Sequence, residues 1–119
     1  MTWDVGFHDD FEPEFDELPK DVQLELLALA ESLRVFGPLM GRPRVDTLNG
    51  SRFSNMKELR FEAAGRVWRF AFAFDYKRHA IILVGGDKSG VSKKRFYRRL
   101  IEKADERFCA YRTMCAKKE

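Results

Sequence analysis

Large apolar residues recur at every second position along residues 55–74, on both sides of the dipeptide Ala64-Gly65. This period is typical of a strand with one buried face, and Gly65 supplies the positive φ that a two-residue hairpin turn requires. A slip of one residue would turn every apolar side chain to the other face, so the pattern also sets the register. The predicted cross-strand pairs are Leu59 with Phe70, Phe61 with Trp68, and Arg60 with Arg69.

A third strand is predicted over residues 79–84, joined to the hairpin through a turn at residues 75–78. Pairing Phe74 with His79 keeps the apolar side chains of this strand on the same face as those of the hairpin. The same register places Phe72 against Ile81 and Phe70 against Leu83.

The segments before and after the hairpin alternate between strand and helix patterns. Residues 2–7 alternate as a strand does, and a short helix capped by Asp9 or Asp10 follows. A second helix opens at Pro19 and ends at Gly37-Pro38. A short strand is expected around residues 45–48, and a final helix begins near Ser92. The helical stripes comprise Val22, Leu26, Leu29, Ala30, Leu33 and Phe36, and then Phe96, Leu100, Ala104, Phe108 and Tyr111.

This order predicts a single α+β domain over residues 1–119, built on a small antiparallel sheet with an N-terminal helical hairpin on one face and a C-terminal helix. We expect the helices to cover one sheet face. The opposite face would then be a shallow groove with small residues and arginines, in which Ile82 and Val84 are exposed unless the C-terminal helix or a partner lies across them.

The composition favours a cytoplasmic protein that does not enter a membrane. The chain starts with an acidic segment rather than a basic and apolar one, and its longest aliphatic run, residues 80–84, is too short to cross a bilayer. Cys109 and Cys115 lie on a predicted helix and point in different directions, so neither a disulfide nor a metal site is expected.

Positive charge is concentrated in the second half of the chain. Residues 1–59 carry 12 acidic and 6 basic side chains, whereas residues 60–119 carry 7 acidic and 16 basic ones. Such asymmetry indicates a polyanionic partner for the second half. Long charged side chains that merely solvate an exposed helix face are the simpler alternative for the C-terminal helix taken alone.

Arg60 and Arg69 are the most informative pair in this sequence. Like charges directly opposite each other are unfavourable in a free sheet, so their pairing suggests an anion that binds between them. Phosphate suits this geometry because a planar guanidinium group forms two hydrogen bonds to phosphate oxygens.

Several sequence motifs together resemble the RelE/ParE toxin superfamily, in its HigB-like, phage-associated branch. They are G-R-P-R-V-D-T-L-N-G-S at residues 41–51, N-M-K-E-L-R at 55–60, G-R-V-W-R at 65–69, I-I-L-V-G-G-D-K at 81–88 and K-K-R-F-Y at 93–97. The combination is specific, whereas each motif alone would be weak. The resemblance covers roughly residues 41–108, with the helical hairpin upstream.

The resemblance implies a RelE-like fold and the toxin of a type II toxin–antitoxin system. Such toxins are ribosome-dependent mRNA endonucleases that use the neighbouring 2′-hydroxyl as the nucleophile, without a metal or another cofactor. It also implies a cognate antitoxin, commonly of the helix-turn-helix, HigA-like type, and complexes that are often dimers of heterodimers.

The reaction needs cations for the charge on the phosphorane, a base and an acid. Arg60 matches the phosphate-stabilising arginine of the family, and Arg69 is its expected helper. Lys88 follows the last strand, where the family places further active-site groups. Asp87 accepts a proton or orients Lys88, or else only caps a turn. Tyr97 stacks on a base or serves as an acid, or else anchors the C-terminal helix.

Further basic residues are interpreted as positioning contacts to RNA phosphates. His8 and His79 stand next to predicted turns, so a turn role competes with proton transfer for both. The Gly-Gly-Asp-Lys run after the last strand departs from the aromatic residue and paired lysines of better-known relatives, which leaves the acid and the base unassigned. The expected RNA contacts are Lys57, Arg66, Lys93, Lys94 and Arg95.

Two other functions remain compatible with the sequence. ParE-type members of the superfamily inhibit DNA gyrase by binding rather than by cleavage. A non-enzymatic RNA-binding or phage regulatory module would need the basic face but no particular arginine.

Overall fold

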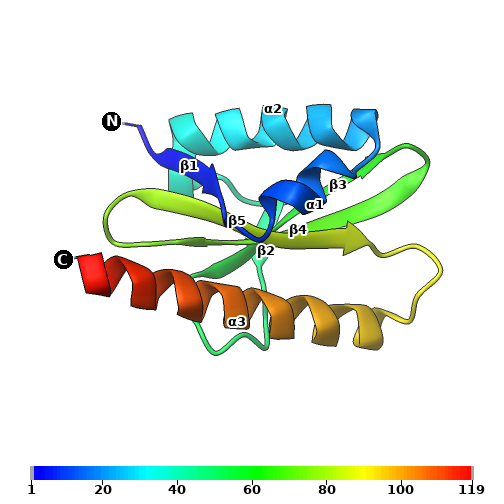
Figure 1. The fold of residues 1–119 in the computed structure, drawn as a ribbon. Helices are drawn as coiled ribbons and strands as arrows, with labels where there is room; N and C mark the ends of the chain where they lie inside the picture. Colours follow the sequence, from blue (N-terminus) through cyan, green and yellow to red (C-terminus); the bar gives the residue numbers. More distant parts are fainter. Residues whose placement is uncertain (1, 119) are drawn as a thin grey trace.

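The computed structural model describes the backbone of residues 2–118 and the side chains of residues 2–113. The chain folds into three layers, with the helices α1 and α2 on one face of a sheet and the helix α3 on the other (Figure 1). Among the described residues, no helix is long and apolar enough to cross a membrane. The predicted α+β arrangement is confirmed.

The five strands form one mixed sheet in the order β1-β5-β4-β3-β2. β1 pairs parallel with β5 and all other neighbours are antiparallel, so the sheet is mixed rather than purely antiparallel. The strands are β1 (Asp4–Phe7), β2 (Val45–Thr47), β3 (Met56–Ala63), β4 (Arg66–Phe74) and β5 (His79–Asp87).

The predicted hairpin register is confirmed for β3 and β4. Leu59 pairs with Phe70, and Arg60 with Arg69. The turn residues Ala64 and Gly65 have φ values of 54° and 71°. Positive φ at both central positions defines a type I′ turn, whose twist matches that of the flanking strands.

The predicted register of β5 against β4 is wrong. Phe74 pairs with Ala80 rather than with His79, because the backbone N–H of Asp75 donates to the carbonyl of His79 and shortens the loop to three residues. Arg78, with φ 66°, closes this loop in the left-handed conformation. A bulge between Ala71 and Phe72 shifts the register once more. The resulting pairs are Phe72 with Ile82, Ala71 with Val84, and Phe70 with Gly85.

The corrected register divides the apolar residues of β5 between two cores. Ala80 and Ile82 pack in the core below α1 and α2, whereas Ile81 and Leu83 pack in the core below α3. The expected open groove on the second face is therefore also wrong. Apolar side chains on that face require cover, and the small Ala71 and Ala73, both fully buried, let α3 approach closely.

The helices follow their predicted stripes. α1 spans Glu12–Asp16, α2 spans Lys20–Phe36 and a short 3-10 helix, η1, spans Gly37–Leu39. Neither Asp9 nor Asp10 caps α1, whose N-cap is Phe11 without a side-chain hydrogen bond. Gly37, with φ 52°, ends α2 beneath Trp3, where a Cβ would lie 2.3 Å from the indole nitrogen.

α3 spans Lys93–Lys118 and buries Phe96, Leu100, Ala104 and Phe108 against the sheet. Its Cys109 is an exposed free thiol, and the side chain of Cys115 lies outside the described residues.

Candidate functional site: a cationic cluster beside the start of α3

Arg60 and Arg69 extend from adjacent strands on the α3 side of the sheet, as their pairing requires. Their surroundings differ. The side chain of Arg60 is 27% exposed, whereas that of Arg69 is 8% exposed. Only Arg60 therefore offers its guanidinium group to an incoming ligand.

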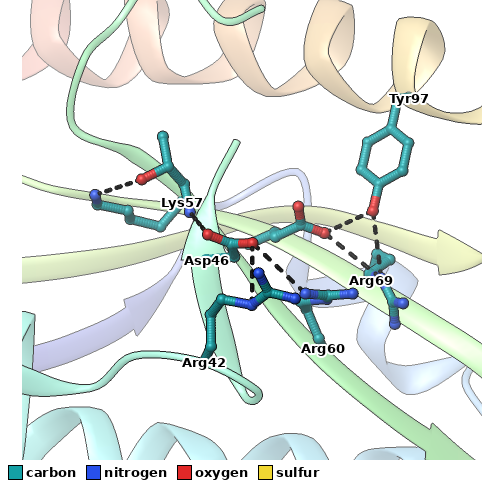
Figure 2. A network of polar contacts seen from close by, with 8 residues as sticks. Arg42, Asp46, Lys57, Arg60, Arg69 and Tyr97 are labelled. Carbon is teal, nitrogen blue, oxygen red and sulfur yellow. Dashed lines mark hydrogen bonds and ion pairs between the residues drawn. The ribbon is translucent and has the colours of Figure 1, made fainter. Parts of the chain in front are cut away.

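Arg69 is held inside the protein by Glu58 and Tyr97 (Figure 2). Its Nε lies 3.5 Å from Glu58 Oε1 and 3.3 Å from the phenol oxygen of Tyr97, and its Nη1 donates to the carbonyl of Trp68 at 2.9 Å. The side chain of Glu58 is also 8% exposed, so each buried charge neutralises the other.

Tyr97 fastens α3 to this ion pair. Its hydroxyl donates to Glu58 Oε1 at 2.7 Å. Burial raises the pKa of Tyr97, and the hydrogen bond to the Glu58 carboxylate raises that pKa further. The phenol is therefore neutral, and its hydrogen bonds to Glu58 and Arg69 fasten α3 to the sheet, which fits the anchoring role that was the alternative to base stacking or proton donation.

Arg60 contacts a carboxylate from the edge strand. Its Nη1 lies 3.5 Å from Asp46 Oδ2, which Arg42 also approaches, with its Nε at 3.8 Å (Figure 2). The Nε of Arg60 is buried and has no hydrogen-bond partner in the described part of the chain. Arg42 and Arg60 thus share one carboxylate, and Arg60 has N–H groups that donate no hydrogen bond to the protein.

Lys88 directly follows β5. We call Arg60, Arg69 and Lys88 together the cationic cluster. Burial lowers the pKa of the Lys88 ammonium group, and the positive charges of Arg69, Lys93 and Arg60 lower that pKa further. The opposing influence of Glu58 is smaller. Lys88 therefore lies in a positive field, which favours a bound anion and makes its ammonium group a readier proton donor.

Asp87 lies away from this cluster. It pairs with Trp68 in the ladder, so its side chain points to the α2 side of the sheet. It accepts the backbone N–H of Ser89 at 2.8 Å and lies 3.2 Å from Arg66. Burial acts to raise the pKa of Asp87, but the Ser89 hydrogen bonds and the Arg66 charge outweigh it, and the net pKa is lowered.

The expected RNA contacts divide between the two faces. Lys93, Lys94 and Arg95 are exposed at the start of α3, on the side of the cluster. Lys57 lies two residues before Leu59 on β3, so its side chain points to the same sheet face, the one covered by α2. Its Nζ contacts Thr47 Oγ1 at 3.1 Å. Arg66 is beside the hairpin turn and is paired with Asp87.

The two histidines lie outside the cluster. The Nδ1 of His8 accepts the backbone N–H of Asp10 at 3.1 Å, which stabilises the turn before α1. His79 lies 3.0 Å from Asp75 at the opposite end of β4 and β5. Both positions agree with the turn roles considered above.

The carboxylates that organise the cluster, Glu58 and Asp46, were missed by sequence reasoning. A signal for Glu58 exists, because Glu58 and Arg60 alternate on one strand face and the predicted pairing places Glu58 opposite Ala71, beside Arg69. Asp46 had no such signal, because its position depends on how the short β2 pairs with β3. No group of three metal-ligating side chains occurs among the described residues.

Comparison with known proteins places the chain in a family. A family model described as phage-derived protein Gp49-like (DUF891) matches residues 13–109. A Mycobacterium tuberculosis protein named “Putative toxin HigB3” is 46% identical over 93 residues, which cover 78% of this chain and 79% of that protein. “Putative toxin HigB2” of the same organism is 45% identical over 87 residues, or 72% of this chain and 43% of that longer relative.

Two solved structures share the fold. An arginine-to-alanine double mutant of the Escherichia coli toxin RelE in the free state superposes with a TM-score of 0.57 at 12% identity, over 83% of this chain and 97% of that chain. RelE in an archaeal RelE–RelB complex from Pyrococcus horikoshii gives 0.53 at 19% identity, over 76% and 100%. At these identities the likeness concerns the fold alone. The chain belongs to the Gp49-like family of phage-derived proteins, is related to the HigB toxins and has the RelE fold, which confirms the resemblance found in its sequence.

Proposed function

We propose that this protein is the toxin of a type II toxin–antitoxin system, and that it acts in the cytoplasm by cutting mRNA on the ribosome. The observation that carries the proposal is the partly exposed guanidinium group of Arg60, which lies in one positive field with Lys88. The names of the two Mycobacterium relatives support the toxin assignment.

The chemistry requires no group beyond RNA and side chains. The 2′-oxygen attacks the adjacent phosphorus, the bond from phosphorus to the 5′-oxygen breaks, and a 2′,3′-cyclic phosphate and a 5′-hydroxyl result. A base takes the proton of the 2′-hydroxyl, and an acid gives one to the 5′-oxygen. Arg60 binds the non-bridging oxygens and stabilises the charge that develops on them.

Lys88 is the proposed acid or second cation, because its lowered pKa favours proton release toward a leaving oxygen. Arg69 and Tyr97 are proposed to position the site through Glu58, since their polar groups bond to each other and to the protein. Asp87 is proposed to shape the loop that presents Lys88. Binding of the message in the ribosome supplies the remaining orientation.

The proposed partners are the ribosome with its message and a cognate antitoxin. A helix-turn-helix antitoxin of the HigA-like type and assembly as a dimer of heterodimers follow from the family resemblance. The RelE–RelB complex supports the antitoxin by analogy only, because its likeness to this chain lies in the fold.

Mapping of mRNA ends in a translating extract tests the proposal. The wild-type protein should introduce in-frame cuts, and Arg60→Ala and Arg60→Lys should each reduce their rate by about 10²–10³-fold, because lysine cannot replace a bidentate phosphate contact. Arg34→Ala is the matched control, since Arg34 is an exposed arginine on α2 paired with Glu31. Supercoiling defects without RNA cuts would instead favour gyrase inhibition, and full tolerance of lysine would favour a non-enzymatic binder.

A further inference from the structure

The helix α2 carries a second apolar stripe on the side that faces away from the sheet. Leu24 and Leu27 are 54% and 47% exposed, and Val35 is 45% exposed. Phe36, the last residue of α2, and Leu39 of η1 add further exposed apolar surface at the C-terminal end of the helix. We call the following residues the outer face of α2: Leu24, Leu27, Ala28, Glu31, Arg34 and Val35.

The helical period places the outer face opposite the buried stripe of α2. Leu24, Ala28, Glu31 and Val35 follow one another at intervals of four, three and four residues, which keeps them on one side of a helix. The fully buried Leu33 follows Leu24 by about two and a half turns and therefore points the other way.

Apolar residues on both sides are typical of a helix that is buried all round. Figure 1 shows α2 instead along one outer edge of the molecule, with the sheet on its other side. The outer face is thus an apolar surface of the kind that marks an interaction site.

The charges on the outer face balance each other. Arg34 donates from Nη2 to Glu31 Oε1 at 2.7 Å and from Nε to Glu31 Oε2 at 3.0 Å. Both side chains remain accessible, at 62% for Glu31 and 46% for Arg34. The face therefore has no net charge, and neither a polyanion such as RNA nor an acidic polypeptide finds an excess of opposite charge on it.

A second copy of the chain matches the outer face because the face is symmetric about Glu31. Leu27 lies four residues before Glu31, and Val35 lies four residues after it. When two α2 helices pack antiparallel about a two-fold axis at Glu31, Leu27 of each copy faces Val35 of the other. Leu24 then approaches the exposed Leu39 of the second copy. A two-fold interface requires a self-complementary surface of this kind, in which every contact occurs twice.

The same axis brings opposite charges together. Arg34 follows Glu31 by less than one turn, so each Arg34 lies near the axis and close to the Glu31 of the second copy as well as its own. Two carboxylates and two guanidinium groups then form one balanced network at the centre of the interface, with apolar contacts on either side. Such a network stabilises ion pairs better than an isolated exposed pair does.

From the second apolar stripe, its balanced charges and its symmetry, we infer that the outer face of α2 is the interface of a homodimer of this chain. The inference goes beyond the proposed function and does not depend on it. The outer face and the cationic cluster lie on opposite sides of the sheet, since Arg60 and Arg69 extend toward α3. Both cationic clusters therefore stay uncovered in the dimer.

The size of the outer face indicates a weak dimer. α2 has 17 residues and is therefore about 26 Å long and, with its side chains, about 10 Å wide. One pair of such helices buries less than the roughly 1,200 Å² at which stable interfaces begin. We expect a dissociation constant of about 10–100 µM, so that the dimer forms in concentrated solution and separates on dilution.

Sedimentation equilibrium of the full-length chain, from about 1 µM to about 500 µM, measures this association. Leu24→Glu/Val35→Glu should weaken it by at least about tenfold, because the two carboxylates enter the apolar contacts and each does so twice in the dimer. Tyr76→Glu is the matched control, since it places the same carboxylate at an 88% exposed position in the β4–β5 turn. We expect it to associate as the wild type does.

A charge exchange identifies the occupant as a second copy. Glu31→Arg and Arg34→Glu each gather four like charges at the axis, so each variant alone should be at least about tenfold weaker in self-association. An equimolar mixture of the two variants should form a heterodimer with about the affinity of the wild type, because each supplies the charges that the other lacks. Glu102→Arg and Arg98→Glu are the matched controls, which reverse exposed charges on α3 and should associate normally.

Each outcome supports or overturns the inference. A wild-type chain that stays monomeric at the highest concentration would overturn it, and cutting of mRNA by that chain would leave the proposed function standing. Association that survives the Leu24/Val35 changes, or a mixture without rescue, would also overturn it. If the monomeric chain instead binds the protein encoded next to it and loses that binding in Leu24→Glu/Val35→Glu, the face belongs to that protein. Leu27→Gln, expected to weaken association in the same direction, keeps the test decisive if a charged variant disturbs the fold.

Discussion

Arg60 and Arg69 lie directly opposite each other across the β3–β4 ladder, yet only Arg60 reaches solvent, with 27% of its side chain exposed against 8% for Arg69. The repulsion expected between them is relieved from within, because Glu58 neutralises Arg69 and Asp46 approaches Arg60. The pair that suggested one shared phosphate site is therefore divided between a buried structural cation, Arg69, and a partly exposed one, Arg60, for which we propose phosphate binding.

We expect the loss of Arg69 to lower the stability of the fold rather than to act directly on RNA cleavage. Arg69→Met leaves the buried carboxylate of Glu58 without its cation, and breaking a buried pair in this way costs about 3–5 kcal/mol. Urea denaturation at pH 7 measures the change in the free energy of unfolding.

The double variant Arg69→Met/Glu58→Leu is the control for this prediction. With both charges removed, much of the lost stability should return, because two apolar side chains often replace a buried ion pair at little cost. A stable Arg69→Met protein that no longer cuts RNA would contradict the structural role and return Arg69 to the phosphate site.

Asp46 should compete with RNA phosphate for Arg60. Asp46→Asn removes the charge 3.5 Å from the guanidinium group, and an exposed ion pair of this kind is worth up to about 1 kcal/mol. We therefore expect up to about fivefold tighter binding of an RNA that carries a 2′-deoxy substitution at the cut position, as measured by fluorescence anisotropy. Asp21→Asn, on the opposite layer, is the charge-matched control and should leave affinity unchanged. Equal or weaker binding by Asp46→Asn would show that Asp46 supports Arg60 instead.

The sequence predicts those parts of the fold that depend on local patterns. The β3–β4 register follows from strict alternation around Ala64-Gly65, and the buried stripe of α2 follows from its period. The β5 register does not follow, because the loop length depends on Arg78 adopting positive φ and on a bulge near Ala71, neither of which changes the hydrophobic pattern.

The candidate site is predictable to a smaller extent. Arg60 and Lys88 are indicated by the motifs, and the positive charge of Arg60 is one of the influences that lower the pKa of Lys88. The sheet face on which Lys57 or Asp87 lies depends on the strand registers and on the order of strands in the sheet. Both are set by contacts between residues that are distant in the sequence. The cover that α3 places over the second sheet face is likewise a tertiary property that the pattern of this helix alone does not determine.

Acid should weaken the contact between α1 and α3. Arg107 is buried, donates to both carboxylate oxygens of Glu14 at 2.8 Å and 2.6 Å, and donates to the carbonyl of Leu83. The hydrogen bonds from Arg107 lower the pKa of Glu14 below its ordinary 4.5, so the folded state favours the ionised form. This contribution is complete above the unfolded pKa and is lost as the pH falls through the lower, folded value.

Glu14→Gln tests this dependence. At pH 7 the variant should lose about 1 kcal/mol, a modest figure because the Glu14 side chain is 46% exposed. The difference from the wild type should shrink as the pH is lowered below 4.5 in urea denaturation series. Glu12→Gln, an exposed change in the same helix, should show no such convergence. A constant gap at every pH would mean that the loss comes from packing rather than from charge.

Gly85 connects the core to the cationic cluster, because it occupies the strand position three residues before Lys88. A Cβ on Gly85 would lie 1.9 Å from the ring of Phe70, a fully buried side chain below α1 and α2. Gly85→Ala must therefore displace that ring or the strand, and overpacking of this kind costs about 1–3 kcal/mol. Thermal unfolding should detect the loss. Gly6→Ala, where a Cβ meets nothing within 4 Å, should change stability by far less. If Gly85→Ala folds by moving β5, Lys88 moves with it, and cleavage should fall further than stability explains. Unchanged cleavage in a folded variant would show that the ring of Phe70 gives way instead of the strand.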